Sequence, residues 1–480
     1  MVFSSLFFVF FFLVVCYGVY FCAKRMKTRN IILLVSSLIF YAWGGPALVL
    51  LLCLMTFICW IGALIIDQNT IPKLRLALCW VTAAICIAIL FIYKYTGFAL
   101  SVTYSIFNIE AAIPSIALPI GISFYTFQLI SYVIDVYRGE VEAQKRYWLL
   151  LLYASLFHQC IAGPIVRYAD VNEDINNRVV TLDEVSRGIS RFSVGLAKKA
   201  LLANGCGVIT DTIFNQKGVM MGTDGMAGLS SAAILLASLC YMLQLYLDFS
   251  AYSDMAIGMG LMVGFHYKEN FNYPYLAHSA TDFWRRWHMS LSSFFRDYVY
   301  IPLGGNRVSV PRHIFNMLCV WALTGIWHGA NWNYILWGLY WFAFLVLEKY
   351  LIKPKKDPKI LPRLIGIVFT LIVTFFSTML FKFNDLAALG QAVANIFVSN
   401  GNGFSDTATD LLFKNNIFFL AAAILACTPL IPAISALCKK TKVTERVYVA
   451  ISTVTPVLLI VVSAIALAGD SYNPFLYFQF

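Results

Sequence analysis

The chain has 480 residues, of which 60% are hydrophobic and only 12% are charged, and its formal net charge is +11. A mean hydropathy of +0.76 excludes an ordinary water-soluble domain, which needs far more charge on its surface. Apolar runs of roughly 17–25 residues, the length that crosses a bilayer as a helix, recur along the chain and predict an all-α polytopic membrane protein. The excess of Lys and Arg is interpreted as the signal of cytoplasmic loops, not as a nucleic-acid-binding surface.

The first apolar run, residues 2–23, has the length of a signal peptide but not its charge pattern. Lys24 and Arg25 follow the run instead of preceding it, and no small-residue cleavage site stands out. We therefore expect a retained first transmembrane helix with its amino terminus outside.

Lys and Arg residues form clusters in the first and last thirds of the chain. They lie at residues 24–29, 73–75, 138–146, 353–363 and 439–446. With these clusters in the cytoplasm, the first five crossings alternate in direction from an outside amino terminus. The last crossings are expected at 364–381, 417–437 and 447–468, with a polar external loop at 384–415. The sequence thus predicts roughly ten or eleven transmembrane helices.

The middle of the chain is less regular. Thr181 and Glu184 have the spacing of a capping box, which predicts a helix that begins near Thr181 and lies in the membrane interface before it dips inward. Between residues 264 and 312 no apolar run is long enough to span the bilayer. Short, tilted or re-entrant helices are expected there, because backbone groups within a membrane must satisfy their hydrogen bonds internally.

Nothing in the sequence signals a second domain or a metal centre. No internal repeat, coiled coil or low-complexity linker divides the chain, so we predict a single transmembrane domain over residues 1–480. The 12 cysteines form no C-x-x-C pair and do not neighbour spaced histidines. Neither a metal site nor a disulfide framework is therefore predicted.

Polar side chains inside apolar helices are costly and therefore indicate function. The main ones are Gln128 and Asp135 in residues 118–139, Arg167 in 158–168, and Asp248 and Asp254 in 244–260. Taken alone, the amide and the carboxylates would also suit the ion-coupled path of a secondary transporter or flippase, and that alternative stays open. A structural scaffold for polysaccharide secretion would need none of them.

His328 is the strongest single candidate for a catalytic residue. It lies between Trp327 and Gly329 in "LTGIWHGANWNYILWGLYW" (323–341), a run with few other polar side chains. Imidazole has the unperturbed pKa best suited to taking a proton near neutral pH, and burial favours its neutral, basic form. We predict that His328 is catalytic; the alternative is a buried histidine bonded to a backbone carbonyl.

A second histidine, His288, lies in "DFWRRWHMSLSSFFRDYVYIPLGG" (282–305), where acidic, basic and aromatic residues are mixed. Two roles are considered for it. It could act in catalysis, by orienting or polarising the substrate carbonyl, or it could pair structurally with a carboxylate such as Asp282. The remaining histidines are assigned structural roles: His158, His266, His278 and His313.

The same stretch predicts a binding site for an anionic acyl donor that carries a nucleotide. Arginine forks bind phosphate and aromatic faces stack on a base. The predicted substrate-binding residues are Arg285, Arg286, Asp282, Trp284, Trp287, Asn331, Asp248 and Gln128. The alternative is plain membrane anchoring by positive charges and an aromatic belt.

Several motifs resemble those of the bacterial membrane-bound O-acyltransferases. They are "LPIGISFYTFQLISYVIDVYRG", "IAGPIVRY", "QLYLDFSAYSDMAIGMG", "DFWRRWHMSLSSFFRDYVYIPLGGNR" and "TGIWHGANWNYILWG". The opening "MVFSS", the segment "RGISRFSVGLAKKALLAN" and the length are similar to the alginate and peptidoglycan O-acetyltransferase branch. The teichoic-acid D-alanyl transfer branch fits less well at the amino terminus.

The resemblance implies an acyl transfer that spans the bacterial cytoplasmic (inner) membrane. Acetyl-CoA would serve as donor substrate on the cytoplasmic side, with no permanently bound cofactor and no metal. The acetyl group would pass to an extracytoplasmic polysaccharide or cell-wall glycan, with the help of a secreted or membrane-anchored SGNH-hydrolase-like partner. His328 of "WHGA" falls on the family's catalytic histidine and His288 on its second prominent one. Where family members often carry Pro, this chain has His158.

Overall fold

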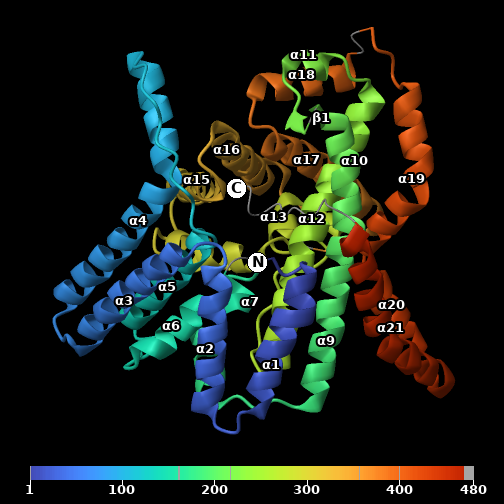
Figure 1. The fold of residues 1–480 in the computed structure, drawn as a ribbon. Coiled ribbons are helices and arrows are strands. Elements are labelled where there is room, and N and C mark those ends of the chain that lie inside the picture. The colour runs from blue at the N-terminus through green and yellow to red at the C-terminus, as the bar shows by residue number, and fades with distance from the viewer. Residues whose placement is uncertain (1, 161–162, 217, 356, 399–400, 470–480) are drawn as a thin grey trace. The chain divides into compact units, whose positions relative to one another are not determined.

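The computed structural model describes residues 2–160, 163–216, 218–355, 357–398 and 401–469. Regular structure in these ranges is helical apart from a small antiparallel hairpin, β1 (Asn215–Gln216) and β2 (Val219–Met220), in which Asn215 pairs with Met220 (Figure 1). Three segments discussed above contain residues outside the described ranges. They are Ile161 and Ala162 in the motif at 158–168, Lys356 in the basic cluster at 353–363, and residues 399–400 in the expected loop at 384–415.

Eight helices in the described ranges are long and apolar enough to cross a membrane. They are Pro46–Gln68, Pro72–Phe107, Leu182–Phe214, Ser231–Met262, Trp332–Ile352, Ile360–Lys382, Thr407–Ala426 and Lys442–Gly469. Two shorter apolar helices, Phe8–Cys22 and Leu386–Phe397, accompany them. The protein is an all-α multi-pass membrane protein, as the sequence predicts.

The chain divides into two compact units. Unit 1 comprises Met1–Phe192, Tyr252–Glu269 and Ser293–Pro302, and unit 2 comprises Ser193–Ala251, Asn270–Ser292 and Leu303–Phe480. Three of the five divisions fall within helices, namely α9 (Leu182–Ala197), α12 (Ser231–Met262) and α14 (Met289–Phe295). A single domain over 1–480 stays a prediction.

Unit 1 is built from the amino-terminal helices. They are η1 (Phe8–Phe12), α1 (Leu13–Cys22), α2 (Met26–Ala42), α3 (Pro46–Gln68), α4 (Pro72–Phe107), α5 (Ile122–Arg138), α6 (Tyr147–Ser155), α7 (Phe157–Cys160) and α8 (Tyr168–Asn177), together with η4 (Arg296–Tyr300). Helices α3, α4 and α5 pack side by side, as Figure 1 shows. Pro46 and Pro72 begin their helices, where the missing N–H would have no helical partner in any case.

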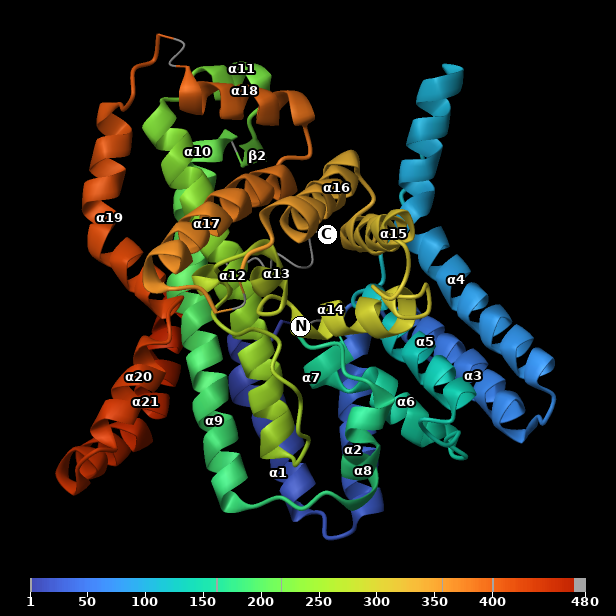
Figure 2. The ribbon, with the colours of Figure 1, turned by 180° about the vertical axis from the view of Figure 1, so that it is seen from behind.

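Unit 2 contains the carboxyl-terminal helices and the short elements between the long ones. Its elements are η2 (Lys198–Ala203), α10 (Asn204–Phe214), α11 (Thr223–Ala227), η3 (Pro274–Leu276), α13 (Ala280–Trp284), α15 (Val310–His328), α16 (Trp332–Leu347), η5 (Glu348–Ile352), α17 (Ile360–Lys382), α18 (Leu386–Phe397), α19 (Thr407–Ala426), α20 (Leu430–Cys438) and α21 (Lys442–Gly469). Helix α16 packs against α13, α15 and α17 (Figure 2).

Two glycines let α15 and α16 approach each other closely. A Cβ atom added to Gly325 would lie 2.5 Å from the carbonyl oxygen of Tyr334, and one added to Gly338 would collide with the carbonyl oxygen of Trp321. Small residues are the usual means by which membrane helices bring their backbones together. This contact fixes the helical hairpin whose turn follows His328.

The capping box is confirmed. The Thr181 backbone N–H donates to Glu184 Oε2 at 2.9 Å, and the Glu184 N–H donates to Thr181 Oγ1 at 3.2 Å. Helix α9 begins at the next residue, Leu182. It continues through η2 into α10 as one helix of 33 residues. The expected position of its first part in the membrane interface stays a prediction.

Residues 264–312 form the predicted short helices, η3, α13, α14 and η4. Two expectations near the carboxyl end are wrong. The segment 384–415 is not simply a loop, because α18 forms within it, with the Asp385 carboxylate accepting the Ala387 N–H at 2.9 Å. The crossing expected at 417–437 is interrupted between α19 and α20 at Pro429, which lacks the N–H that would continue the helix.

Candidate functional site

His328 is the last residue of α15 and is 7% exposed. Its ring packs edge-on against Trp337 and Phe381, with centroid distances of 4.8 and 5.2 Å. Gly329 follows in an extended conformation, where a Cβ atom would collide with the ring of Tyr334. The tight turn therefore holds the imidazole at the end of the α15–α16 hairpin.

The predicted residue Asn331 belongs to this turn. Its Oδ1 accepts the backbone N–H of Trp332 at 2.7 Å, at the position that precedes α16. Asn is a preferred residue at the amino-terminal cap of a helix, where a side-chain oxygen satisfies a free N–H. Its role in this structure is therefore to begin α16, and a role in substrate binding stays a prediction.

A cavity of about 40 Å³ opens beside His328 within unit 2. Aromatic and aliphatic side chains make most of its wall: Leu245, Phe249, Tyr275, Phe283, Trp284, Trp287, Trp337, Trp341 and Phe381. Three hydroxyls of α17, those of Thr374, Ser377 and Thr378, complete it. An apolar cavity with a few convergent polar groups is the usual form of a small-molecule site.

Two of the cavity tryptophans differ in how their indole N–H groups are used. Trp341 Nε1 donates to Ser377 Oγ at 2.7 Å. Trp284 Nε1 is buried and has no hydrogen-bond partner among the residues that the structure describes. A buried indole N–H usually finds an acceptor, so the N–H of Trp284 is available to a ligand.

Helix α13, which carries Trp284, is held by Glu348 at the end of α16. The Glu348 carboxylate accepts the backbone N–H groups of Ala280, at 2.6 Å, and Thr281, at 3.0 Å. A carboxylate at a helix amino terminus satisfies free N–H groups and interacts favourably with their dipoles. The contact ties the short helix to the hairpin that carries His328.

His288 lies between α13 and α14, is 1% exposed and has a backbone φ of +44°. Its Nδ1 lies 3.2 Å from Asn270 Oδ1, so its partner is an amide and not the carboxylate of Asp282 suggested by the sequence. Asp282 instead contacts His278 Nδ1 at 3.1 Å and accepts from Arg286 Nε at 2.9 Å. Asp282 is unsuited to His288 because these two neighbours, each four residues away along the chain, already engage it.

The ring of Trp327 contacts both candidate histidines. Its centroid lies 6.0 Å from that of His288 and 5.0 Å from that of His328. Phe249, which lines the cavity, also packs edge-on against His288 at 4.7 Å. The two imidazoles, 40 positions apart in sequence, therefore belong to one aromatic cluster of unit 2.

The predicted donor-binding arginines lie beside this cluster. Arg285 is exposed, while Arg286 is partly buried and engaged by Asp282. Trp287 lies in the cavity wall with Trp284. A role of these residues in donor binding stays a prediction.

The remaining predicted residues are placed elsewhere. Asp248 forms a buried ion pair with Lys199, at 2.7 Å, in unit 2. Gln128 lies on α5 in unit 1, where its side-chain amide is buried without a hydrogen-bond partner in the described part of the chain. Their assignment to substrate binding stays a prediction.

The acidic residues that suggested an ion-coupled path have local partners. In unit 1, Asp135 accepts from the Tyr298 hydroxyl at 2.7 Å, and Asp254 pairs with Arg191 at 2.9 Å. A carboxylate in apolar surroundings needs a partner of this kind, because an unpaired buried charge is strongly destabilising. These contacts account for the two carboxylates without an ion path.

Sequence reasoning missed several residues of the site. Asn270 belongs to no recognisable motif. The hydroxyls of α17 did carry a signal, because Thr370, Thr374, Ser377 and Thr378 recur at helical spacing in an otherwise apolar run. A polar stripe on one face of a membrane helix indicates a face turned toward protein or a cavity.

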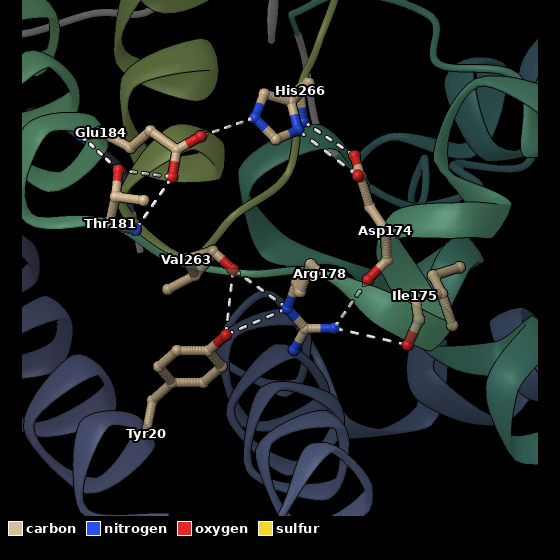
Figure 3. A network of polar contacts seen from close by, with 8 residues as sticks. All are labelled: Tyr20, Asp174, Ile175, Arg178, Thr181, Glu184, Val263 and His266. Atoms are coloured by element: carbon tan, nitrogen blue, oxygen red, sulfur yellow. Dashed lines mark hydrogen bonds and ion pairs between the residues drawn. The ribbon is translucent and has the colours of Figure 1, made fainter.

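The histidines assigned structural roles have structural partners. His158 Nδ1 contacts the Tyr267 hydroxyl at 2.6 Å, and His313 Nδ1 contacts that of Tyr350 at 2.5 Å. His266 lies between two carboxylates in unit 1, with Nδ1 at 3.4 Å from Asp174 Oδ1 and Nε2 at 3.1 Å from Glu184 Oε1 (Figure 3).

Below His266 in Figure 3, the guanidinium of Arg178 joins distant segments of unit 1. Its Nε donates to the Tyr20 hydroxyl and to the Val263 carbonyl oxygen, each at 3.0 Å, and its Nη1 donates to the Asp174 carbonyl oxygen at 3.1 Å. The network links α1, α8 and the residues after α12, so it serves the fold of unit 1.

Comparison with known proteins decides the family. Residues 146–384, which include both histidines and the whole cavity lining, match the sequence model described as MBOAT, membrane-bound O-acyltransferase family. The chain is 34% identical to the probable alginate O-acetylase AlgI of Azotobacter vinelandii, with all of both chains covered. The chain belongs to the membrane-bound O-acyltransferase family. It is an O-acyltransferase, as the motifs indicated.

Further relatives agree with the branch predicted from the motifs. The probable alginate O-acetylase AlgI of Pseudomonas putida is 36% identical over the full length of both chains. The peptidoglycan O-acetyltransferase of Helicobacter pylori is 30% identical over 100% of this chain and 98% of its own. The teichoic acid D-alanyltransferase of Bacillus subtilis is 29% identical over 51% of this chain and 62% of its own, in line with the poorer fit noted from the sequence.

Proposed function

We propose that this protein is an acetyltransferase of the bacterial cytoplasmic (inner) membrane that passes the acetyl group of acetyl-CoA outward for O-acetylation of an extracytoplasmic polysaccharide. The relatives named as alginate and peptidoglycan O-acetylating enzymes support a polymer of this class as the final acceptor. A secreted or membrane-anchored SGNH-hydrolase-like protein is the proposed partner for the last transfer.

The observation that carries the proposal is the position of His328, whose imidazole lines an aromatic cavity together with three hydroxyls of α17. The cavity lies within the residues that match the O-acyltransferase family model. The relatives named as O-acetylating enzymes support acetyl as the transferred acyl group.

In this mechanism His328 is the general base. The oxygen of the acceptor hydroxyl attacks the carbonyl carbon of the acetyl thioester while His328 takes the hydroxyl proton. The new C–O bond forms, the C–S bond breaks, and the proton passes from His328 to the departing thiolate of CoA. Positioned proton transfer of this kind contributes roughly 10²–10⁴-fold to a rate.

The test is reconstitution of the purified protein in proteoliposomes, with acetyl-labelled CoA on the cytoplasmic face and the candidate partner with its glycan outside. The expected result is label on the outer acceptor with wild-type protein and none with His328→Ala. His266→Ala, in unit 1, is the matched histidine control and should transfer label. Absence of label from the outer acceptor with well-folded wild-type protein and its partner would overturn the proposal.

A further inference from the structure

Asn270 is fully buried and its amide oxygen collects three hydrogen bonds from one short segment. The Ser290 backbone N–H lies 3.1 Å from Asn270 Oδ1, the Ser290 hydroxyl 2.8 Å, and His288 Nδ1 3.2 Å. The Met289 N–H also donates to the backbone oxygen of Asn270 at 2.9 Å. One asparagine thus organises residues 288–290.

These contacts determine the orientation of the amide. A backbone N–H can only donate, so the side-chain atom that Ser290 N–H meets must be the amide oxygen. Turning the amide over would place its NH₂ group against the N–H of Ser290, two donors facing each other. The amide is therefore oriented by the backbone and not by the imidazole.

The orientation of the amide in turn determines where the imidazole carries its proton. An amide oxygen has no proton to offer, so the bond between Asn270 Oδ1 and His288 requires the proton on Nδ1. The Ser290 hydroxyl also lies 3.4 Å from Nδ1, but it donates its proton to Asn270 Oδ1 at the shorter distance of 2.8 Å. The other ring nitrogen, Nε2, then carries a lone pair. It is buried and has no hydrogen-bond partner among the residues that the structure describes.

The surroundings keep this ring neutral. Burial lowers the pKa of His288, which lies outside the membrane-spanning helices, to about 3. The rings packed against it, those of Phe249, Phe271 and Trp327, carry no charge, and neither do Asn270 and Ser290. A neutral imidazole with its proton on Nδ1 can accept a hydrogen bond at Nε2 but cannot donate one there.

The backbone of His288 adopts a left-handed conformation that is energetically unfavourable for a residue with a side chain. A φ of +44° is uncommon for a residue with a side chain, and such conformations persist where the surrounding contacts enforce them. The contacts of Asn270 with residues 288–290 supply that restraint.

We propose that Asn270 is a positioning residue that holds His288 with its proton on Nδ1, so that Nε2 accepts a hydrogen bond from an N–H, O–H or S–H group of the substrates. This role replaces polarisation of the thioester carbonyl, which would need a proton on Nε2. The inference deepens the proposed acetyl transfer and rests on it for the identity of the substrates. The state of the ring does not depend on that identity.

The first test reads the ring directly, without activity. ¹⁵N-histidine-labelled protein in nanodiscs is studied by solid-state NMR, and His288 is assigned among the six histidines by the signal lost in His288→Gln. The expected spectrum has a protonated Nδ1 and a bare Nε2 for this residue, retained in Asn270→Asp and lost in Asn270→Leu. A protonated Nε2 in the wild-type protein would overturn the proposal.

The second test asks whether Asn270 acts through His288. Asn270→Leu should lower kcat/KM for acetyl transfer about 10-fold or more, as loss of a residue that orients a functional histidine commonly does. In a His288→Gln background the same substitution should have no further effect. Additive losses, or an unchanged kcat/KM of the folded enzyme, would contradict the proposal.

Asn316 provides the matched control. It is also fully buried in unit 2, and its Nδ2 donates to the carbonyl oxygens of Leu303, at 3.2 Å, and Gly305, at 3.0 Å. Asn316→Leu should lower the Tm without changing the His288 spectrum. If the wild-type protein transfers no acetyl group, the proposed function fails, while the spectrum still decides the state of His288.

Discussion

Trp341 Nε1 donates a hydrogen bond to Ser377 Oγ across 2.7 Å, and both side chains are buried in the wall of the cavity that His328 lines. The bond joins α16 to α17 and uses the indole N–H of Trp341. The cavity therefore contains two kinds of tryptophan. Trp341 supports the wall through its N–H, whereas the N–H of Trp284 is available to a ligand.

Trp284→Phe tests the free indole N–H. Loss of one hydrogen bond of about 0.5–1.5 kcal/mol should lower kcat/KM for acetyl transfer by roughly 2–10-fold, with the Tm nearly unchanged. Steady-state kinetics and thermal unfolding in detergent measure the two quantities.

The control for that variant is Trp341→Phe. This change leaves the Ser377 hydroxyl without its indole donor, so the free energy of unfolding should fall by about 1 kcal/mol or more. If Trp284→Phe destabilises the protein as much as Trp341→Phe and leaves the kinetics intact, its indole has a purely structural role.

His328→Ala should lower the rate of acetyl transfer by about 10²–10⁴-fold, because it removes the general base. Membrane insertion and expression should remain normal, since His328 ends a helix whose packing depends on Gly325. The measurement is labelled acetyl transfer per folded protein, with His313→Ala as a second control. Near-normal transfer in a well-folded His328→Ala protein would exclude this residue as the base.

Arg285→Gln tests the predicted donor site. The Arg285 side chain is exposed, so it is accessible to the phosphates of acetyl-CoA. A charge-assisted contact of roughly 1.5–3 kcal/mol predicts a KM for acetyl-CoA about tenfold higher or more. Arg286→Gln should also perturb Asp282, with which Arg286 is paired, and is the less specific variant.

The anchoring alternative makes a different prediction for these arginines. It predicts lower protein levels or altered topology, with an unchanged KM in the protein that inserts correctly. A short acetyl thioester that lacks the nucleotide serves as the control donor, because its use should not depend on Arg285. Unchanged kinetics with both donors would assign the stretch to anchoring.

The stability of unit 1 should depend on pH through His266. Burial alone would lower the pKa of this imidazole, but its hydrogen bonds to Glu184 and Asp174 outweigh that effect and raise the pKa above 6.5. A raised pKa in the folded state means that the protonated ring stabilises the fold below about pH 6.5 and that this contribution is lost as the pH rises through the folded-state pKa. The effect should be small, because the side chain is 53% exposed.

Thermal unfolding of the wild type and His266→Gln between about pH 5 and pH 9 measures this contribution. The Tm difference between the two proteins should be largest at acidic pH and shrink toward alkaline pH. A difference that is constant with pH would show that protonation of His266 does not contribute.

The sequence by itself determined what depends on local pattern. Apolar runs located membrane helices, because crossing the bilayer requires that length of apolar chain. The spacing of Thr181 and Glu184 located the start of α9, because a capping box involves only neighbouring backbone groups. His328 was predicted to be catalytic from its immediate neighbours and from the family motifs. The comparisons confirm the family, and the catalytic role of His328 stays a prediction.

Only the tertiary structure decided which side chains meet. Asn270 and not Asp282 contacts His288, and Trp341 contacts Ser377 across 36 residues of sequence. It also paired Asp248 with Lys199, a partner that no sequence pattern indicated. Such contacts depend on how helices cross and on which of several polar partners is nearest after packing. The free-energy differences between alternative partners come from burial and geometry, and a sequence pattern records neither.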